Sequence, residues 1–143
     1  TEGKRIISKK TSRDVRRLMR LVVENGTGRN ASAEGYLVGG KTGTADKPKR
    51  GGYSRRSLIS SFVGAFPMTE PRYVVLVTLD EPQGNKRTHG YATGGWVAAP
   101  VVKRVIERAG PLLGVQPIDE KSPAVKKELF VNFKREGRQL ASF

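Results

Sequence analysis

The chain contains no cysteine, and only one histidine and one tryptophan, among its 143 residues. Without cysteine it can form no disulfide, no thiol nucleophile and no Cys-ligated zinc site. No apolar run reaches the roughly 18–20 residues that a membrane-spanning helix requires, and no signal peptide is recognisable. We therefore expect any membrane anchor to lie outside these residues, and we predict neither a metal nor a cofactor.

Acidic residues are also scarce. Lysine and arginine number 27 against 13 aspartates and glutamates, which gives a formal net charge of +14. Such a charge can attract nucleic acid or an anionic polymer. However, the basic residues are spread along the chain, and aromatic residues do not alternate with them as stacking platforms would require. A solvated basic surface is favoured, and a basic nucleic-acid or anionic-polymer-binding module is the alternative function.

The spacing of apolar residues predicts an amphipathic helix over residues 12–24. Its apolar stripe comprises Val15, Leu18, Met19 and Val22. Its opposite face, expected toward solvent, comprises Arg13, Arg16, Arg17 and Arg20. Thr11 and Asp14 have the spacing of a capping box, and Gly26 supplies the end of the helix.

Three strands are expected after this helix. The first begins at Tyr36 and runs into a Gly-Gly-Lys-Thr-Gly-Thr segment, and a basic loop over 46–56 separates it from a strand over 57–66. A third strand over 72–79 is apolar on both faces, which predicts a sheet covered on both sides. The connections contain no helix, so the strands should be antiparallel.

The C-terminal part is predicted to be one helix followed by a tail. Apolar residues repeat at helical spacing up to about Leu113. Pro100 either lies in the first turn of a helix that starts near Ala98 or kinks a longer one. Residues 115–143 are charged and weakly periodic, so we expect a basic, loosely ordered tail after a folded unit over 1–114. The expected fold class is α/β of the α+β type, with about three antiparallel strands flanked by N- and C-terminal helices.

Lys41 and Thr42 lie in a segment that formally matches a phosphate-binding loop. Residues 35–42 fit the pattern G-x-x-x-x-G-K-[ST]. That loop requires a strand before it and a helix beginning at its lysine. Here the apolar residues fall inside the supposed loop, and Gly-Thr-Ala-Asp-Lys-Pro, which will not propagate a helix, follows Thr42. The nucleotide interpretation is therefore rejected.

The same segment suits a strand that lines a cleft. Lys41 would supply positive charge, and the hydroxyls of Thr42 and Thr44 could bind a carboxylate. Gly43 would let a substrate lie against the backbone, and the N–H of Thr44 could face a reacting carbonyl as part of an oxyanion hole. A glycine-rich bulged edge strand explains so short a motif equally well.

Further segments keep a characteristic order and spacing along residues 4–116. They are Gly35–Ala45, Ser61–Pro67, Pro71–Val75, Leu79–Pro82, Gly94–Gly95 and Ala98–Val101, together with the end of the first helix, Glu24–Gly28. With these residues the chain resembles the C-terminal part of the transpeptidase domain of class B penicillin-binding proteins, especially the septal, division-specific enzymes. The resemblance implies part of a penicillin-binding or serine β-lactamase-like transpeptidase fold.

The resemblance implies a serine acyl transfer that cross-links peptidoglycan stem peptides ending in D-Ala-D-Ala and that β-lactams intercept. The family uses three motifs, Ser-x-x-Lys, Ser-x-Asn and Lys-Thr-Gly. Only the third is present, because none of the nine serines has lysine three residues on or asparagine two residues on. By resemblance, Lys41, Thr42, Gly43 and Thr44 bind the substrate or β-lactam, and the Thr44 N–H is an oxyanion donor.

Two tyrosines are weaker candidates, again by resemblance. Tyr91, in a loop before the last helix, would wall the pocket, and Tyr53, after the motif, is less favoured. The implied partners are the stem peptide or β-lactam, the missing upstream half of the domain and division-complex proteins, with no specific nucleic acid. The chain alone is expected to be inactive and to self-associate, and its parent to lie on the periplasmic side of the inner membrane.

Overall fold

The computed structural model describes residues 3–49 and 52–131, without the side chains of residues 49 and 53–56. Three strands form one antiparallel sheet in the order β1-β2-β3. The strands are β1 (Gly39–Lys49), β2 (Gly52–Phe66) and β3 (Tyr73–Asp80). The helices are α1 (Lys9–Asn25), η1 (Arg29–Ala31), η2 (Lys86–Thr88), α2 (Gly94–Val97), α3 (Ala99–Leu112) and α4 (Pro123–Leu129). The α+β class and the antiparallel pairing are confirmed.

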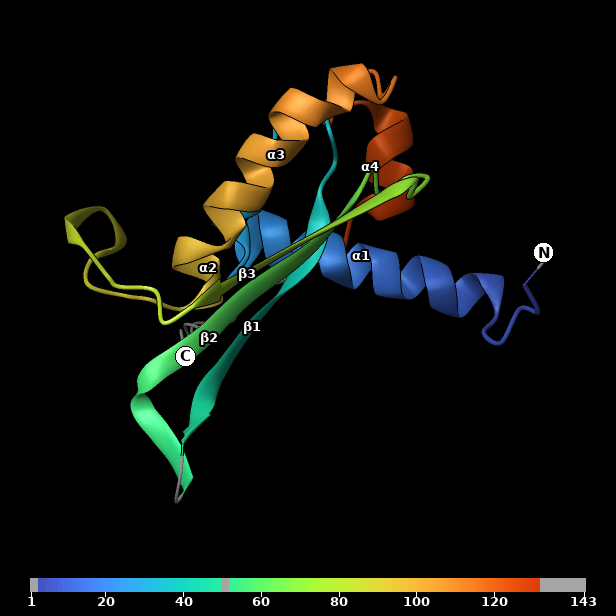
Figure 1. Cartoon of the computed structure of the whole chain (residues 1–143). Coiled ribbons are helices and arrows are strands. Elements are labelled where there is room, and N and C mark those ends of the chain that lie inside the picture. The colour runs from blue at the N-terminus through green and yellow to red at the C-terminus, as the bar shows by residue number, and fades with distance from the viewer. Residues whose placement is uncertain (1–2, 50–51, 132–143) are drawn as a thin grey trace, which may run out of the picture.

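The core lies between α3 and one face of the sheet (Figure 1). Phe62 and Phe66 of β2 are fully buried together with Val102 and Ile106 of α3. A Cβ atom on Gly64 would lie 3.0 Å from the Val102 side chain, so helix and strand pack closely there. This packing holds α2, at the start of the same helical region, against the middle of the sheet.

The prediction that the arginine face of the first helix points to solvent is wrong for Arg16, Arg17 and Arg20, whereas Arg13 is exposed. Arg20 is only 4% exposed and donates to Val38 O (3.0 Å), Glu24 (2.9 Å) and Glu120 (2.7 Å). In the expected apolar stripe, Val15 is 45% exposed and Leu18 is 58% exposed. The helix therefore docks through guanidinium groups that satisfy backbone carbonyls and carboxylates, while part of its apolar stripe has no cover within the described residues.

The start of this helix also differs from the expectation. Ser8, not Thr11, caps it, and its hydroxyl accepts the Thr11 N–H at 3.0 Å. Asp14 pairs with Lys10 one turn earlier instead of closing a capping box. Gly26 ends the helix as predicted.

The first strand begins later and runs farther than expected. Leu37 adopts a positive φ of 46°, which interrupts extended backbone, so β1 starts only at Gly39. Within the predicted loop over 46–56, the described residues up to Lys49 and from Gly52 onward are strand, and Lys47 pairs with Ser54 after a register shift. The loop prediction failed because its glycine, proline and charges suggested a break where the strands continue beyond a bulge.

The position predicted for the third strand, residues 72–79, is confirmed by β3, but the burial predicted for both of its faces is wrong. Its residues alternate between half-buried and exposed, and Val74 and Leu76 are 68% and 65% exposed. The sequence predicted that both faces of the sheet are covered. Within the described part of the chain, the face that carries Val74 and Leu76 is open.

The C-terminal helical region divides at Ala98. The short helix α2 ends there, and Pro100 occupies the first turn of α3, as the first of the two sequence interpretations required. The expectation of a loose tail is wrong for residues 115–131. There α4 buries Val125 and Leu129 in a small cluster with Leu37 and Met68, because these side chains supply an apolar face that the low periodicity concealed.

Lys47 ties the outer hairpin to the end of β3. Its Nζ lies 2.8 Å from Asp80 and 3.3 Å from Glu81. The hydrogen bond to Asp80, and after it the one to Glu81, raises the pKa of Lys47 above its ordinary 10.5. A raised pKa in the folded state means that the stabilisation is present below the unfolded value and disappears as pH rises through the folded one.

We therefore expect Lys47→Met to lower the melting temperature slightly at pH 8 and to match wild type once pH exceeds the raised pKa. Thermal melts of both proteins between pH 8 and 12 test this, and exposed Lys86→Met is the control that should follow wild type throughout. A difference that stays constant across that range would show that the ion pairs are not its cause.

Candidate functional site

The middle of β1 carries the Lys-Thr-Gly-Thr segment at the edge of the sheet. Lys41 and Thr44 are exposed, and Thr42 is half-buried. Their partners on β2 are Val63 for Lys41 and Ser60 for Thr44, so the segment is regular strand. Since Lys41 lies inside a strand and no helix begins there, the rejection of a phosphate-binding loop is confirmed.

Lys41 and Thr42 converge at the open edge of β1. The Lys41 ammonium donates to the backbone oxygen of Thr42 at 2.9 Å and to its hydroxyl at 3.3 Å. Thr42 O therefore faces the edge that carries no neighbouring strand in the described structure. Peptide groups alternate in direction along a strand, so the Thr44 N–H faces this same edge.

The beginning of α2 closes against Thr44 and Gly43. Gly94 N donates to Thr44 Oγ1 at 3.1 Å. A Cβ on Gly94 would lie 2.1 Å from Ser61 O and 2.6 Å from Gly43 O, so only glycine fits this approach. The Thr44 hydroxyl keeps its own proton, which stays available for an anion.

Tyr91 lies in the loop that leads to α2. It is 55% exposed and stacks on Trp96, with ring centroids 5.7 Å apart and planes 15° apart. Ser60 donates to Ala92 O at 2.6 Å and thereby ties this loop to β2. The structure thus brings Tyr91 to the end of α2 that contacts Thr44, whereas the Tyr53 side chain lies outside the described residues.

Residues 1–107 match the family model described as penicillin binding protein transpeptidase domain. The chain belongs to this family. The matched range includes α1, the three strands and α2, and with them the Lys-Thr-Gly-Thr segment of β1, which we call the edge site. The Lys-Thr-Gly strand is therefore seen in its family context and is not an isolated short motif.

Relatives of this transpeptidase-family chain have consistent descriptions. This chain is 47% identical over 124 residues to a probable peptidoglycan D,D-transpeptidase FtsI of Caulobacter vibrioides. The match covers 80% of this chain and 21% of the relative. It is 46% identical over 114 residues to stage V sporulation protein D of Bacillus subtilis, covering 80% and 17%. The apo transpeptidase domain of Burkholderia pseudomallei penicillin-binding protein 3 superposes with a TM-score of 0.69 at 42% identity, covering 82% and 34%. The chain thus spans about a fifth of the length of these curated relatives.

The sequence of this transpeptidase-family chain led to no site role for Thr27. Its hydroxyl lies 3.2 Å from that of Thr42, although 15 residues separate them. The available signal was the Gly26-Thr27-Gly28 sequence after the helix, in which two glycines frame one hydroxyl. Nothing in the spacing indicated that this turn folds back onto β1.

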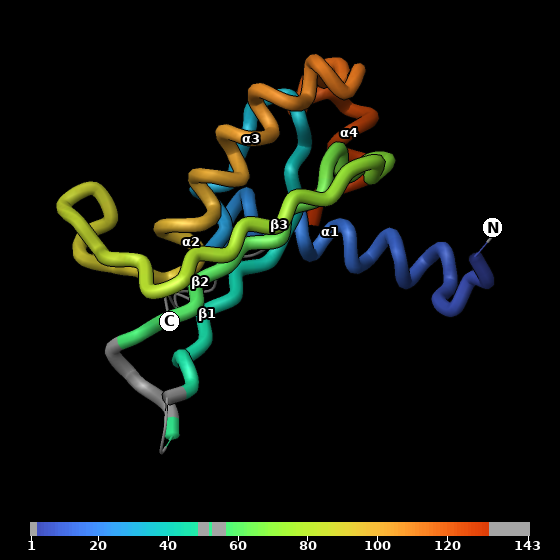
Figure 2. Tube along the Cα trace, viewed as in Figure 1, coloured from blue at the N-terminus to red at the C-terminus, as the bar shows by residue number. Residues whose placement is uncertain are grey.

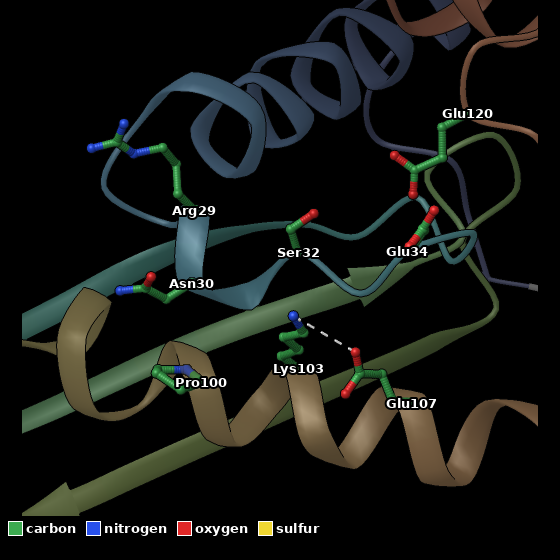
Figure 3. Close-up of a pocket in the computed structure, with 8 residues that line it drawn as sticks. All are labelled: Arg29, Asn30, Ser32, Glu34, Pro100, Lys103, Glu107 and Glu120. Carbon is green, nitrogen blue, oxygen red and sulfur yellow. Dashed lines mark ion pairs between the residues drawn. The ribbon is translucent and has the colours of Figure 1, made fainter. Parts of the chain in front are cut away.

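One hollow of the described structure does not coincide with the Lys-Thr-Gly-Thr edge of β1. It has a volume of about 640 Å³ and lies between the η1 loop and α3, where Lys103 and Glu107 face each other at 3.8 Å (Figure 3). Its lining residues are Arg29, Asn30, Ser32, Glu34, Pro100, Lys103, Glu107 and Glu120. None of the Lys-Thr-Gly-Thr residues lines it.

Two features are absent from the residues that the structure describes. No group of three or more potential metal-ligating side chains occurs there. No helix in that part of the chain combines the length and apolarity needed to cross a bilayer.

Proposed function

We propose that this chain is the C-terminal part of a septal peptidoglycan D,D-transpeptidase that cross-links stem peptides by serine acyl transfer. The observation that carries the proposal is the Lys-Thr-Gly-Thr segment at the open edge of β1, in a chain of this family. A description as a probable peptidoglycan D,D-transpeptidase FtsI belongs to a relative at 47% identity, and it supports the same reaction here.

In this reaction Lys41 and Thr42 bind the carboxylate of the stem peptide or β-lactam. An ammonium and a hydroxyl that converge on one edge can both donate to an anion, and hydrogen bonds to charged groups are stronger than neutral ones. Thr44 contributes its hydroxyl to the same carboxylate, and its N–H is one donor of the oxyanion hole. The common direction of the Thr44 N–H and Thr42 O supports this assignment.

Gly43 and Tyr91 shape the pocket. Gly43 leaves the strand free of a side chain where the substrate backbone approaches. Tyr91, held by its stack on Trp96, forms a wall near the end of α2.

The nucleophile and its lysine base lie on a part of the protein outside this chain. None of the nine serines here fits Ser-x-x-Lys or Ser-x-Asn, and the chain covers 34% of the Burkholderia transpeptidase domain. Fluorescent penicillin tests this division. The complete protein should become labelled with one equivalent, and the 143-residue chain should remain unlabelled. Stoichiometric labelling of the chain by itself would refute the proposal.

The upstream half of the domain is the partner that covers the open sheet. Val74 and Leu76 form an exposed apolar strip on β3, which is also an edge strand. Unpaired edges and apolar strips of this kind favour association. In the absence of the upstream half, two copies of the chain therefore associate through this strip.

We expect sedimentation velocity of the isolated chain to show association that increases with concentration. Replacing both Val74 and Leu76 by lysine should shift the population toward monomer, because like charges would face each other across the edge. Leu112→Lys, at an exposed residue on α3, is the control and should associate as wild type does. A monodisperse wild-type monomer at every concentration would contradict this expectation.

The parent protein works on the periplasmic side of the inner membrane, anchored by a segment outside these residues, together with division-complex proteins. The sporulation and FtsI relatives support a role in building septal wall. The alternative of a nucleic-acid-binding module gains no support, because several arginines are used internally against carbonyls and carboxylates.

A further inference from the structure

A second hydroxyl stands beside the carboxylate-binding pair. Thr27 Oγ1 lies 3.2 Å from Thr42 Oγ1, which in turn lies 3.3 Å from Lys41 Nζ. The three groups come from two elements, the turn after α1 and the strand β1. They form one continuous polar series that ends at the open edge.

Close backbone contacts hold Thr27 in this place. A Cβ on Gly95 would lie 2.3 Å from Thr27 O, and a Cβ on Gly28 would lie 2.9 Å from the buried ring of Phe62. Asn30 donates to Gly95 O at 2.9 Å and joins the same turn to α2. Thr27 is thus fixed between α2 and the core although its side chain is exposed.

The Thr42 side chain faces the same turn. Its Cγ2 atom lies beside Gly95, 3.4 Å from where a Cβ on that residue would stand. Its hydroxyl lies within hydrogen-bond distance of both the Thr27 hydroxyl and the Lys41 ammonium. These two neighbours act on the direction of the Thr42 hydroxyl proton.

We propose that Thr27 is a positioning residue that turns the Thr42 hydroxyl proton toward the substrate carboxylate. This inference rests on the proposed function. A hydroxyl has two lone pairs and one proton, whereas an ammonium only donates. Lys41 donates to one lone pair of Thr42. The geometry of the Thr27–Thr42 contact allows either hydroxyl to donate, and in the arrangement that we propose Thr27 donates to the second lone pair of Thr42. The Thr42 proton then has no internal acceptor and points to the edge where the carboxylate binds.

The test uses the complete protein with Thr27→Val, which keeps the shape and removes the hydroxyl, and Thr27→Ser, which keeps the hydroxyl. The probes are a penicillin and its methyl ester, which lacks the negative charge. Losing one oriented hydrogen bond to a charged group should lower the second-order acylation rate for the penicillin about five- to tenfold in Thr27→Val. The lower second-order rate should come from a higher half-saturating concentration of penicillin, while the limiting acylation rate stays unchanged. The ester rate should not change, and Thr27→Ser should stay within about twofold of wild type.

Three results would overturn the inference. Equal slowing of penicillin and ester in Thr27→Val would show a structural role for the side chain. An unchanged penicillin rate in that variant, with wild type acylated normally, would refute the role of Thr27 alone. Failure of wild type to be acylated would refute the proposed function and this inference with it.

Discussion

Replacing Lys41 by glutamine in the complete protein is expected to slow acylation by penicillin about 100-fold, because the variant loses a charge-assisted hydrogen bond and the donor that orients Thr42. Lys41 is exposed at the edge of β1 and donates to Thr42 O at 2.9 Å, so its removal leaves the core unaffected. The loss should therefore appear in the rate while the melting temperature stays at that of wild type. Stopped-flow acylation and thermal melts of the same samples measure both.

Two variants control this experiment. Lys10→Gln removes an equally positive exposed side chain that pairs with Asp14 on α1, far from the edge site, and should acylate as wild type does. Lys41→Arg keeps the charge but changes the geometry of the donors, so an intermediate rate is expected. If Lys41→Gln is acylated at the wild-type rate, Lys41 does not bind the carboxylate.

Replacing Arg20 by methionine is expected to destabilise the chain by about 2–4 kcal/mol, because a buried guanidinium with three partners cannot be removed without leaving polar groups unpaired. Val38 O and Glu120 lose their donor in this variant. Glu120 keeps a second contact, from Gly35 N at 2.8 Å, which limits the loss. Urea unfolding followed by the fluorescence of Trp96 provides the measurement.

The matched control lies on the same helix. Arg13 is exposed, so Arg13→Met should change stability by no more than about 0.5 kcal/mol. Equal unfolding midpoints for Arg20→Met and wild type would show that the helix does not dock through its arginines.

The arginine face illustrates what the sequence could not provide. Helical spacing correctly predicted an amphipathic segment, yet three of the four arginines assigned to solvent make internal contacts. Arg16, Arg17 and Arg20 meet carbonyl groups of Met68, Lys127 and Val38, and these lie far along the chain. Periodicity reports which residues share a face. The partner of that face is set by tertiary packing, which brings α4, far along the chain, beside α1 (Figure 2).

The site was predictable in the same partial way. The composition of Gly39–Ala45 indicated a strand with a cation and hydroxyls, and the structure puts Lys41 and Thr42 together at an open edge. The contacts of Thr27, Gly94 and Trp96 at the site became known only from the structure, because each depends on residues distant in the sequence or on the fold of the preceding loop. Leu37 shows the converse, since its apolar character suggested a strand where its φ of 46° makes a turn.

The most direct test of the central claim is the location of the covalent penicillin adduct. The complete protein, acylated and digested, should carry the adduct on one serine outside these 143 residues when peptides are mapped by mass spectrometry. Lys41→Gln should reduce the yield of that same peptide without moving the adduct. An adduct on any of the nine serines of this chain would contradict the account.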